Sequence, residues 1–303
     1  MIIWNPNIWK NDGHQKKTLS VIIALFFFHQ KQKGDAKMSS SYRTTKKKCF
    51  YPFLNVLKKS PEKETQNYDS FFDPFLSNLK EENDPFKNPG LLTNWQYVKD
   101  HISLIVYDIE RDLWDLHDII HEIIPNINVA LIPIVKYNSN SCCHVFYLKK
   151  EVLDLWQKTA ENVIKISKIS SLSEPFLSSL SDYVKSLEDH AVSSYVPQNL
   201  LDCMEGNMKD FSDDLYLLKN REALFGAVQI GNMEVLKRIH RITGDFLIIP
   251  SSVHELILVP KIKENYENLR SLVNFVNNSI VEEKDIFSYR IFSFDGNLHS
   301  VDL

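Results

Sequence analysis

A pair of apolar runs near the C-terminus constrains the fold of this 303-residue chain more than any other feature. The runs, residues 245–249 and 255–259, flank a Pro-Ser-Ser-Val-His stretch. Short segments rich in Ile, Leu and Val on either side of a polar turn predict two strands folded back on each other. We therefore expect an antiparallel pair whose bend displays the polar side chains of Ser251, Ser252 and His254.

The segments around this pair predict an α+β module over residues 213–303. From hydrophobic periodicity and turn residues we expect, in chain order, a strand at 214–218, helical structure at 222–242 with a break near Gly231 and Asn232, the two strands above, a helix at 265–279, a helical turn at 285–287 and a strand at 289–294. This β-α-β-β-α-β order is a split βαβ pattern.

Residues 91–167 predict another module of similar order. The expected elements are helical spacing from 91 to 102, a strand at 103–107, a helix at 110–123, a strand at 127–137, a turn at 138–141, a strand at 143–148 and a helix at 149–167. Pro133 within its strand implies an edge position or a bulge. The fold class is therefore α+β, with two β-α-β-β-α type modules that have mixed or antiparallel sheets. A helical connector, residues 168–212 with an amphipathic helix at 174–187, joins them.

The N-terminal part of the chain has a different composition. Residues 1–60 hold 12 Lys or Arg and 2 Asp or Glu, whereas the remainder holds 23 and 37. Residues 38–90, rich in Ser, Lys, Asn and Pro, predict a mobile basic arm with one short helix at 71–79. The lysines at 46–48 lack interleaved aromatic residues, so nucleic-acid binding through this arm is the weaker alternative to a solvated tail.

Residues 1–37 have the features of a leader that is not translated. Their apolar run, 19–28, is shorter than the ~20 residues of a membrane span, and no small-residue cleavage site follows it. The codons of Lys33, Gly34 and Asp35 can include a bacterial ribosome-binding sequence just before Met38. We therefore predict that translation starts at Met38.

Several classes of site find no support in the sequence. Only 8 glycines are present, with no phosphate-binding fingerprint, so we predict no cofactor. The four cysteines have no zinc-like spacing and favour the reducing cytoplasm. We expect no membrane span.

Two constellations keep catalysis open as an alternative. His117 and His121 would lie one turn apart on the predicted helix, as in metallopeptidases, although Asp118 replaces the usual glutamate. Ser252 and His254 have the residue types of a hydrolase, but neighbours on a hairpin rarely aim at each other. We therefore predict no catalytic residues and no metal. The weak alternatives are a metal at His117 and His121, or a hydrolase using Ser252 and His254.

The C-terminal module resembles an uncharacterised family of Firmicutes proteins, domain of unknown function 5688. The matching positions are 218–221, 224–227, 244–246, 249–255, 276–277, Val281, Ile286, Ser288 and 290–295. The chain has Ser288-Tyr289 where the family usually has Ser-Asp. The first module is similar more weakly, through residues 98–108 and from His121 onward. The resemblance implies kinship and a bacterial cytosolic setting, and no activity.

These observations favour a non-enzymatic binding or regulatory protein of the bacterial cytoplasm. Its partner would be a protein or a small ligand contacting the second module. The candidate contact residues are Ser251, Ser252, His254, Asn277 and Arg290, and we expect them to converge on one cleft.

Overall fold

The computed structural model describes residues 85, 88–111, 115–138, 143–183, 198–203, 215–222, 224–260, 266–279, 281 and 283–301. The predicted leader, the start at Met38, most of the basic arm, its lysines and the helix at 71–79 lie outside the described residues. Helices and two antiparallel sheets make up the described part, which confirms the α+β class. Among the described residues, no helix combines the length and the apolar character needed to cross a bilayer.

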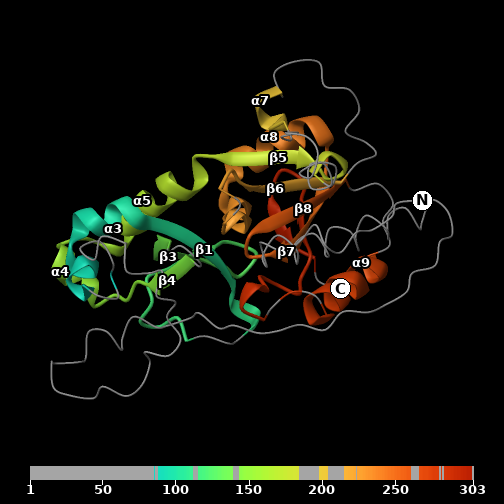
Figure 1. The fold of residues 1–303 in the computed structure, drawn as a ribbon. Coiled ribbons are helices and arrows are strands. Elements are labelled where there is room, and N and C mark those ends of the chain that lie inside the picture. Colours follow the sequence, from blue (N-terminus) through green and yellow to red (C-terminus); the bar gives the residue numbers. More distant parts are fainter. Residues whose placement is uncertain are drawn as a thin grey trace, which may run out of the picture.

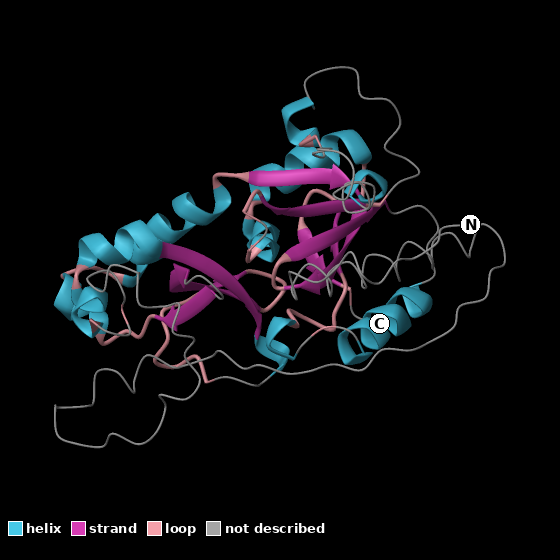
Figure 2. Ribbon diagram, in the orientation of Figure 1, coloured by secondary structure: helices cyan, strands magenta, loops and turns pink. Residues whose placement is uncertain are grey.

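Four antiparallel strands form the first sheet (Figures 1 and 2). They are β1 (Ile102–Asp108), β2 (Glu122–Ile124), β3 (Val129–Asn138) and β4 (Cys143–Tyr147). The central strand is β3, which pairs with β1 along one edge and with β2 and then β4 along the other. Three of the predicted strands are thereby confirmed, with small shifts at their ends.

Pro133 lies in the central strand, so the predicted edge position is wrong. Its partner on β1 is Leu104, whose N–H donates to Ser171 Oγ at 2.8 Å, away from β3. The two residues therefore form a non-hydrogen-bonded pair, and the Pro133 nitrogen faces the other edge. On that edge β2 pairs with β3 only up to Leu131 and β4 only from Ile134 onward, so no ladder bond requires an N–H from the proline.

The helix predicted at 110–123 is absent from the described residues of that segment. Ile109–Arg111 is a short 3-10 turn (η5), Ile119 bridges to Lys149, and Glu122 begins β2. The Asp115 carboxylate accepts a hydrogen bond from the His117 N–H at 2.8 Å, a local turn that competes with a helix. Pairing with β3 thus overrides the helical spacing of the apolar residues.

The helical segments of the first half lie beside this sheet. They are η4 (Pro89–Thr93), α3 (Trp95–His101), α4 (Val152–Trp156) and α5 (Ala160–Leu172). The helix predicted at 149–167 is therefore two helices, because Gln157 takes a left-handed conformation (φ 52°) and the Thr159 side chain caps α5.

Six antiparallel strands form the second sheet, in the order β10-β9-β7-β8-β6-β5. They are β5 (Pro175–Ser179), β6 (Tyr216–Asn220), β7 (Phe246–Ser252), β8 (Glu255–Pro260), β9 (Phe292–Phe294) and β10 (Leu298–Ser300). The predicted pairing of residues 245–249 with 255–259 is confirmed as β7 with β8. The three-residue strand β10 was not predicted.

The helix predicted at 174–187 is wrong over its first part. Residues 175–179 form edge strand β5, which pairs with β6. Asn199, next to the short helix α7 (Leu200–Cys203), covers the open side of this strand, accepting from the Leu177 N–H at 3.0 Å and donating to the Pro175 carbonyl at 3.1 Å. Because β5 completes the second sheet, the predicted helical connector contributes a strand to that sheet.

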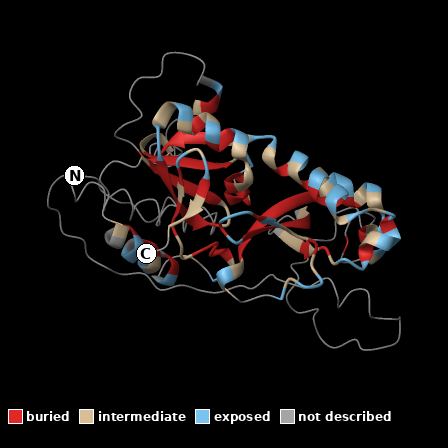
Figure 3. Ribbon diagram, turned by 180° about the vertical axis from the view of Figure 1, so that it is seen from behind, coloured by how far each residue is buried: buried red, intermediate tan, exposed pale blue. Residues whose placement is uncertain are grey.

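Helices cover both faces of the second sheet (Figures 1 and 3). On one face lies α8 (Met233–Thr243), preceded by the 3-10 segment η6 (Gly226–Gly231), with the predicted break at Asn232. On the other face lies α9 (Tyr266–Ser279), through Leu269 and Val273. The core under α8 continues into the first sheet at Leu104 and Leu131, so the two sheets share buried apolar contacts.

Candidate functional site

The two serines before the turn between β7 and β8 are buried, contrary to the prediction that the bend displays their side chains. Ser251 and Ser252 are 1% and 5% exposed. Between them and His254, Val253 packs against the face of the first sheet that contains Ile105 and Ile132. The turn therefore helps to join the two sheets.

Ser252 and His254 are not arranged as a nucleophile and its base. The Ser252 hydroxyl accepts a hydrogen bond from the His254 backbone N–H at 3.0 Å. The His254 Nδ1 accepts from the Phe225 N–H at 3.2 Å, and its Nε2 lies 3.7 Å from Asp285. Nδ1 is occupied by the Phe225 N–H and Nε2 lies near Asp285, so neither ring nitrogen is placed to accept the proton of the Ser252 hydroxyl.

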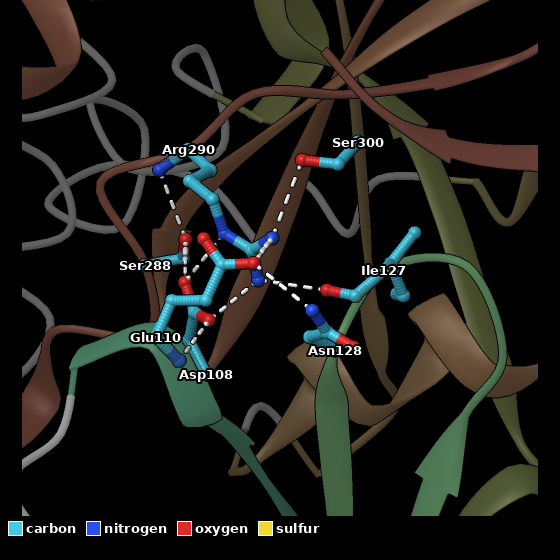
Figure 4. A network of polar contacts seen from close by, with 7 residues as sticks. All are labelled: Asp108, Glu110, Ile127, Asn128, Ser288, Arg290 and Ser300. Atoms are coloured by element: carbon cyan, nitrogen blue, oxygen red, sulfur yellow. Dashed lines mark hydrogen bonds and ion pairs between the residues drawn. The ribbon is translucent and has the colours of Figure 1, made fainter. Parts of the chain in front are cut away.

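Asn277 and Arg290 belong to a second set of contacts. It is centred on Asp108 at the end of β1, and Figure 4 shows Arg290 and Ser288 around this carboxylate. From α9, Asn277 Nδ2 donates to the Ser288 carbonyl at 2.9 Å. The Ser288 hydroxyl donates to Asp108 Oδ2 at 2.5 Å, and it accepts from the Arg290 N–H at 2.9 Å.

The Arg290 guanidinium forms a two-pronged ion pair with Asp108. Its Nε donates to Oδ2 at 3.0 Å and its Nη2 to Oδ1 at 2.5 Å. Nη2 also donates to the Ile127 carbonyl at 2.7 Å, while Nη1 reaches Glu110 Oε1 at 2.8 Å and Ser300 Oγ at 3.3 Å. A planar guanidinium supplies this fork, which an amine could not reproduce. The Asp108 network therefore connects the C-terminal segment to the first sheet.

Ser251 leads to a different polar group on the α9 face of the second sheet. Its hydroxyl donates to Glu255 Oε1 at 3.1 Å, and Glu255 lies directly opposite Lys219 in the β6–β8 pair. Both charged residues are buried, with 2% and 8% of their surface exposed. The Lys219 ammonium lies 4.3 Å from the ring centre of Tyr183 and 5.7 Å from that of Phe176.

One further hydroxyl lies on the same face. Ser178 of β5 pairs with Leu217, so it is a diagonal neighbour of Lys219. Its Oγ is buried and has no hydrogen-bond partner in the part of the chain that the structure describes. We call these residues the Lys219 cluster: Phe176, Ser178, Tyr183, Lys219, Ser251 and Glu255.

Burial dominates the electrostatics of the Lys219 cluster. Desolvation raises the pKa of Glu255, and the nearby Lys219 and the Ser251 hydroxyl only partly oppose it. Desolvation likewise lowers the pKa of Lys219 despite the attraction of Glu255. Tyr183, which is partly buried, also has a raised pKa, chiefly through desolvation and in part through the nearby Glu255. Each group is thus pushed toward its neutral form, a perturbation that is common at binding and catalytic sites.

The weak metal alternative required His117 and His121 to lie one turn apart on a helix, and they do not. Without the helix at 110–123, His117 lies on an exposed turn with Nδ1 2.8 Å from Asp118, and His121 Nδ1 lies 2.9 Å from the Ile119 carbonyl. The hydrogen bond between His117 Nδ1 and the Asp118 carboxylate lowers the pKa of Asp118. Throughout the described segments, no group of three or more His, Cys, Asp or Glu side chains is placed to hold a metal ion.

The five predicted contact residues therefore separate into three groups. Asn277 and Arg290 join the Asp108 network, Ser252 and His254 hold the turn, and Ser251 joins the Lys219 cluster. Sequence reasoning missed Lys219, Glu255, Ser178 and Asp108. The available signal was a charged residue within or next to an apolar strand, because Lys and Glu are rarely fully buried unless paired.

Residues 29–296 match the sequence profile of a family of unknown function, DUF5688. The chain belongs to this family. The match covers most of the chain and confirms the resemblance seen in the sequence. No curated protein and no solved structure matches the chain.

Proposed function

We propose that this DUF5688 protein is a non-enzymatic binding or regulatory module of the bacterial cytoplasm that holds a small polar ligand at the Lys219 cluster. The observation that carries the proposal is the state of Lys219 itself. Lys219 is 8% exposed, and among the described residues its ammonium contacts aromatic rings but forms no hydrogen bond or ion pair. The cytoplasmic setting is favoured by cysteine spacing without a disulfide pattern.

A largely buried ammonium without a hydrogen-bond acceptor is energetically unfavourable, so a ligand that supplies an acceptor would stabilise it. Most buried polar groups in proteins are hydrogen-bonded, and an unsatisfied one costs about 1–3 kcal/mol, or more when charged. The Ser178 hydroxyl is such a group among the described residues, and the largely buried Lys219 is its diagonal neighbour on the same face of the sheet. A ligand with acceptor atoms would satisfy both.

The apolar core on the same face does not require these polar groups. Leu217, Ile249 and Ile257 continue the face as ordinary core residues. A buried ion pair can usually be replaced by apolar residues of similar volume without loss of stability. Groups that reduce stability and make few contacts are typical of functional sites.

A thermal-shift titration of the full chain tests the proposal. The probes are the L-amino acids, acetate, propionate, butyrate and the corresponding short amines, each added separately. We expect at least one probe to raise the Tm of the parent and to leave the Lys219→Met variant unshifted. Lys158→Met is the matched control, since Lys158 also lies over an aromatic ring, that of Trp95 at 5.6 Å. A shift that survives in Lys219→Met, or that Lys158→Met also abolishes, contradicts the assignment of the site.

The double variant Lys219→Met/Glu255→Leu provides a second test, independent of any probe. If the cluster serves binding, the variant should be as stable as the parent or more stable, by up to about 4 kcal/mol. A loss of several kcal/mol in urea unfolding would show that the pair supports the architecture, and the proposed function would then fail.

A further inference from the structure

The Lys219 cluster presents two opposite charges that do not neutralise each other. Lys219 and Glu255 are direct partners across β6 and β8, where Cβ atoms lie about 4.5–5.5 Å apart. Nevertheless, no ion pair within 4.0 Å joins these two described residues, because the lysine ammonium lies against the ring of Tyr183. A cation and an anion thus share one buried site and contact different groups.

Each charge has capacity for a further partner. Glu255 Oε1 accepts from Ser251, whereas no described residue donates to Oε2. On the other side, the Ser178 hydroxyl lies diagonally across from Lys219 with no partner within the described ranges. The site therefore offers two donors at one end and a carboxylate acceptor at the other.

We propose, on the basis of the function proposed above, that the ligand is a small zwitterion of the amino-acid type. Its carboxylate accepts from Lys219 Nζ and Ser178 Oγ, and its ammonium donates to Glu255 Oε2. The rings of Phe176 and Tyr183 form apolar walls beside these charges, and the face of an aromatic ring also attracts a cation.

Charge complementarity selects this ligand class over ligands with one charge. A carboxylate alone would neutralise Lys219 but would lie beside the Glu255 carboxylate. An amine alone would neutralise Glu255 but would lie beside the lysine ammonium. In either case one buried charge would remain uncompensated, which is strongly unfavourable. A zwitterion satisfies both groups and brings no net charge into the buried site.

Isothermal titration of the full chain with matched probes tests this inference. L-alanine carries both charges, propionate lacks the amine and ethylamine lacks the carboxylate; β-alanine and 4-aminobutyrate vary the separation of the charges. We expect at least one zwitterion to bind at least tenfold more tightly than propionate and ethylamine. We also expect Lys219→Met and Glu255→Gln each to weaken that binding at least tenfold. Lys158→Met should leave it unchanged.

Contrary outcomes separate this inference from the proposed function. Binding of propionate as tight as that of the zwitterions, lost in Lys219→Met but kept in Glu255→Gln, would overturn the zwitterion and retain the ligand site. The absence of heat from all five probes would overturn the zwitterion as well. The proposed function fails on a different measurement, a large loss of stability in Lys219→Met/Glu255→Leu.

Discussion

Two buried pairs of opposite charge in this protein differ in how completely they are satisfied. Arg290 and Asp108 meet through two hydrogen bonds, and the surrounding carbonyl, hydroxyl and amide groups complete the network. Lys219 and Glu255 lie directly opposite each other on paired strands, yet their charged ends contact other groups. The comparison teaches that burial alone does not distinguish an architectural pair from a binding site. The two kinds of pair differ in whether each charged atom has a hydrogen-bond partner.

The Arg290 side of this comparison predicts the largest effect. Asp108→Ala should destabilise the protein by about 3–5 kcal/mol in urea unfolding, because it leaves a largely buried guanidinium without its counter-charge. Glu110→Ala is the control, since this carboxylate is half exposed and its pairing with Arg290 is worth at most about 1 kcal/mol. Equal losses in the two variants would contradict the architectural role of the Asp108 network.

A substitution at Gly226 tests how tightly the backbone is packed around Lys219, whose side chain lacks polar partners among the described residues. A Cβ at this position would meet the backbone of His254, Asn220 N at 2.5 Å and Lys219 Cα at 2.7 Å. We expect Gly226→Ala to lower stability toward the upper end of the ~1–3 kcal/mol typical of overpacking. Gly231→Ala should cost less, since its Cβ would meet the movable Leu131 side chain at 3.1 Å. The same urea titration ranks the two variants, and a reversed order would refute the close packing.

The pH dependence of stability sharpens the comparison further. The raised pKa of Glu255 means that the folded state holds a proton that the unfolded state releases near 4.5, so stability falls as pH rises from 4.5 to the folded pKa. The lowered pKa of Lys219 makes stability rise between its folded pKa and 10.5. Glu255→Gln should remove the fall and Lys219→Met the rise, as followed by urea midpoints across this range. Unchanged profiles in both variants would contradict the burial of these charges.

Ser178 and Ser171 give the smallest predicted difference. Ser178→Ala removes a hydroxyl without a described partner, so stability should stay within about 0.5 kcal/mol of the parent. Ser171→Ala leaves the Leu104 N–H of β1 unsatisfied and should cost about 1–3 kcal/mol. Thermal unfolding of the two variants measures both effects. A larger loss for Ser178→Ala would mean that its hydroxyl supports the fold.

Segments with strong local patterns were predictable from sequence. The hairpin of β7 and β8 follows from two apolar runs around a turn, and the break before α8 follows from Gly231 and Asn232. The helix at 266–279 follows from its apolar spacing. The site was predicted only in part. Ser251 was among the candidates, but the lysine and the glutamate that give it a chemical role were not.

The errors share one physical cause. Residues 110–123 and 175–179 have spacings compatible with helices, but the described part of the first segment forms turns, a bridge and the start of β2, and the second segment pairs with β6 as a strand. A single sequence contains no record of which strand will lie beside which. Tertiary pairing therefore outweighs a weak local preference, and such segments cannot be assigned from their own residues.

The sequence by itself determined the α+β class, the family and the elements whose hydrophobic period is unambiguous, because these depend on neighbouring residues. Only the tertiary structure decided the roles of the polar side chains. Arg290 meets a carboxylate 182 residues away, and Lys219 meets Glu255 across a strand pair. Whether a buried charge is satisfied depends on atoms that the fold brings together from distant parts of the chain, so no local pattern could reveal it.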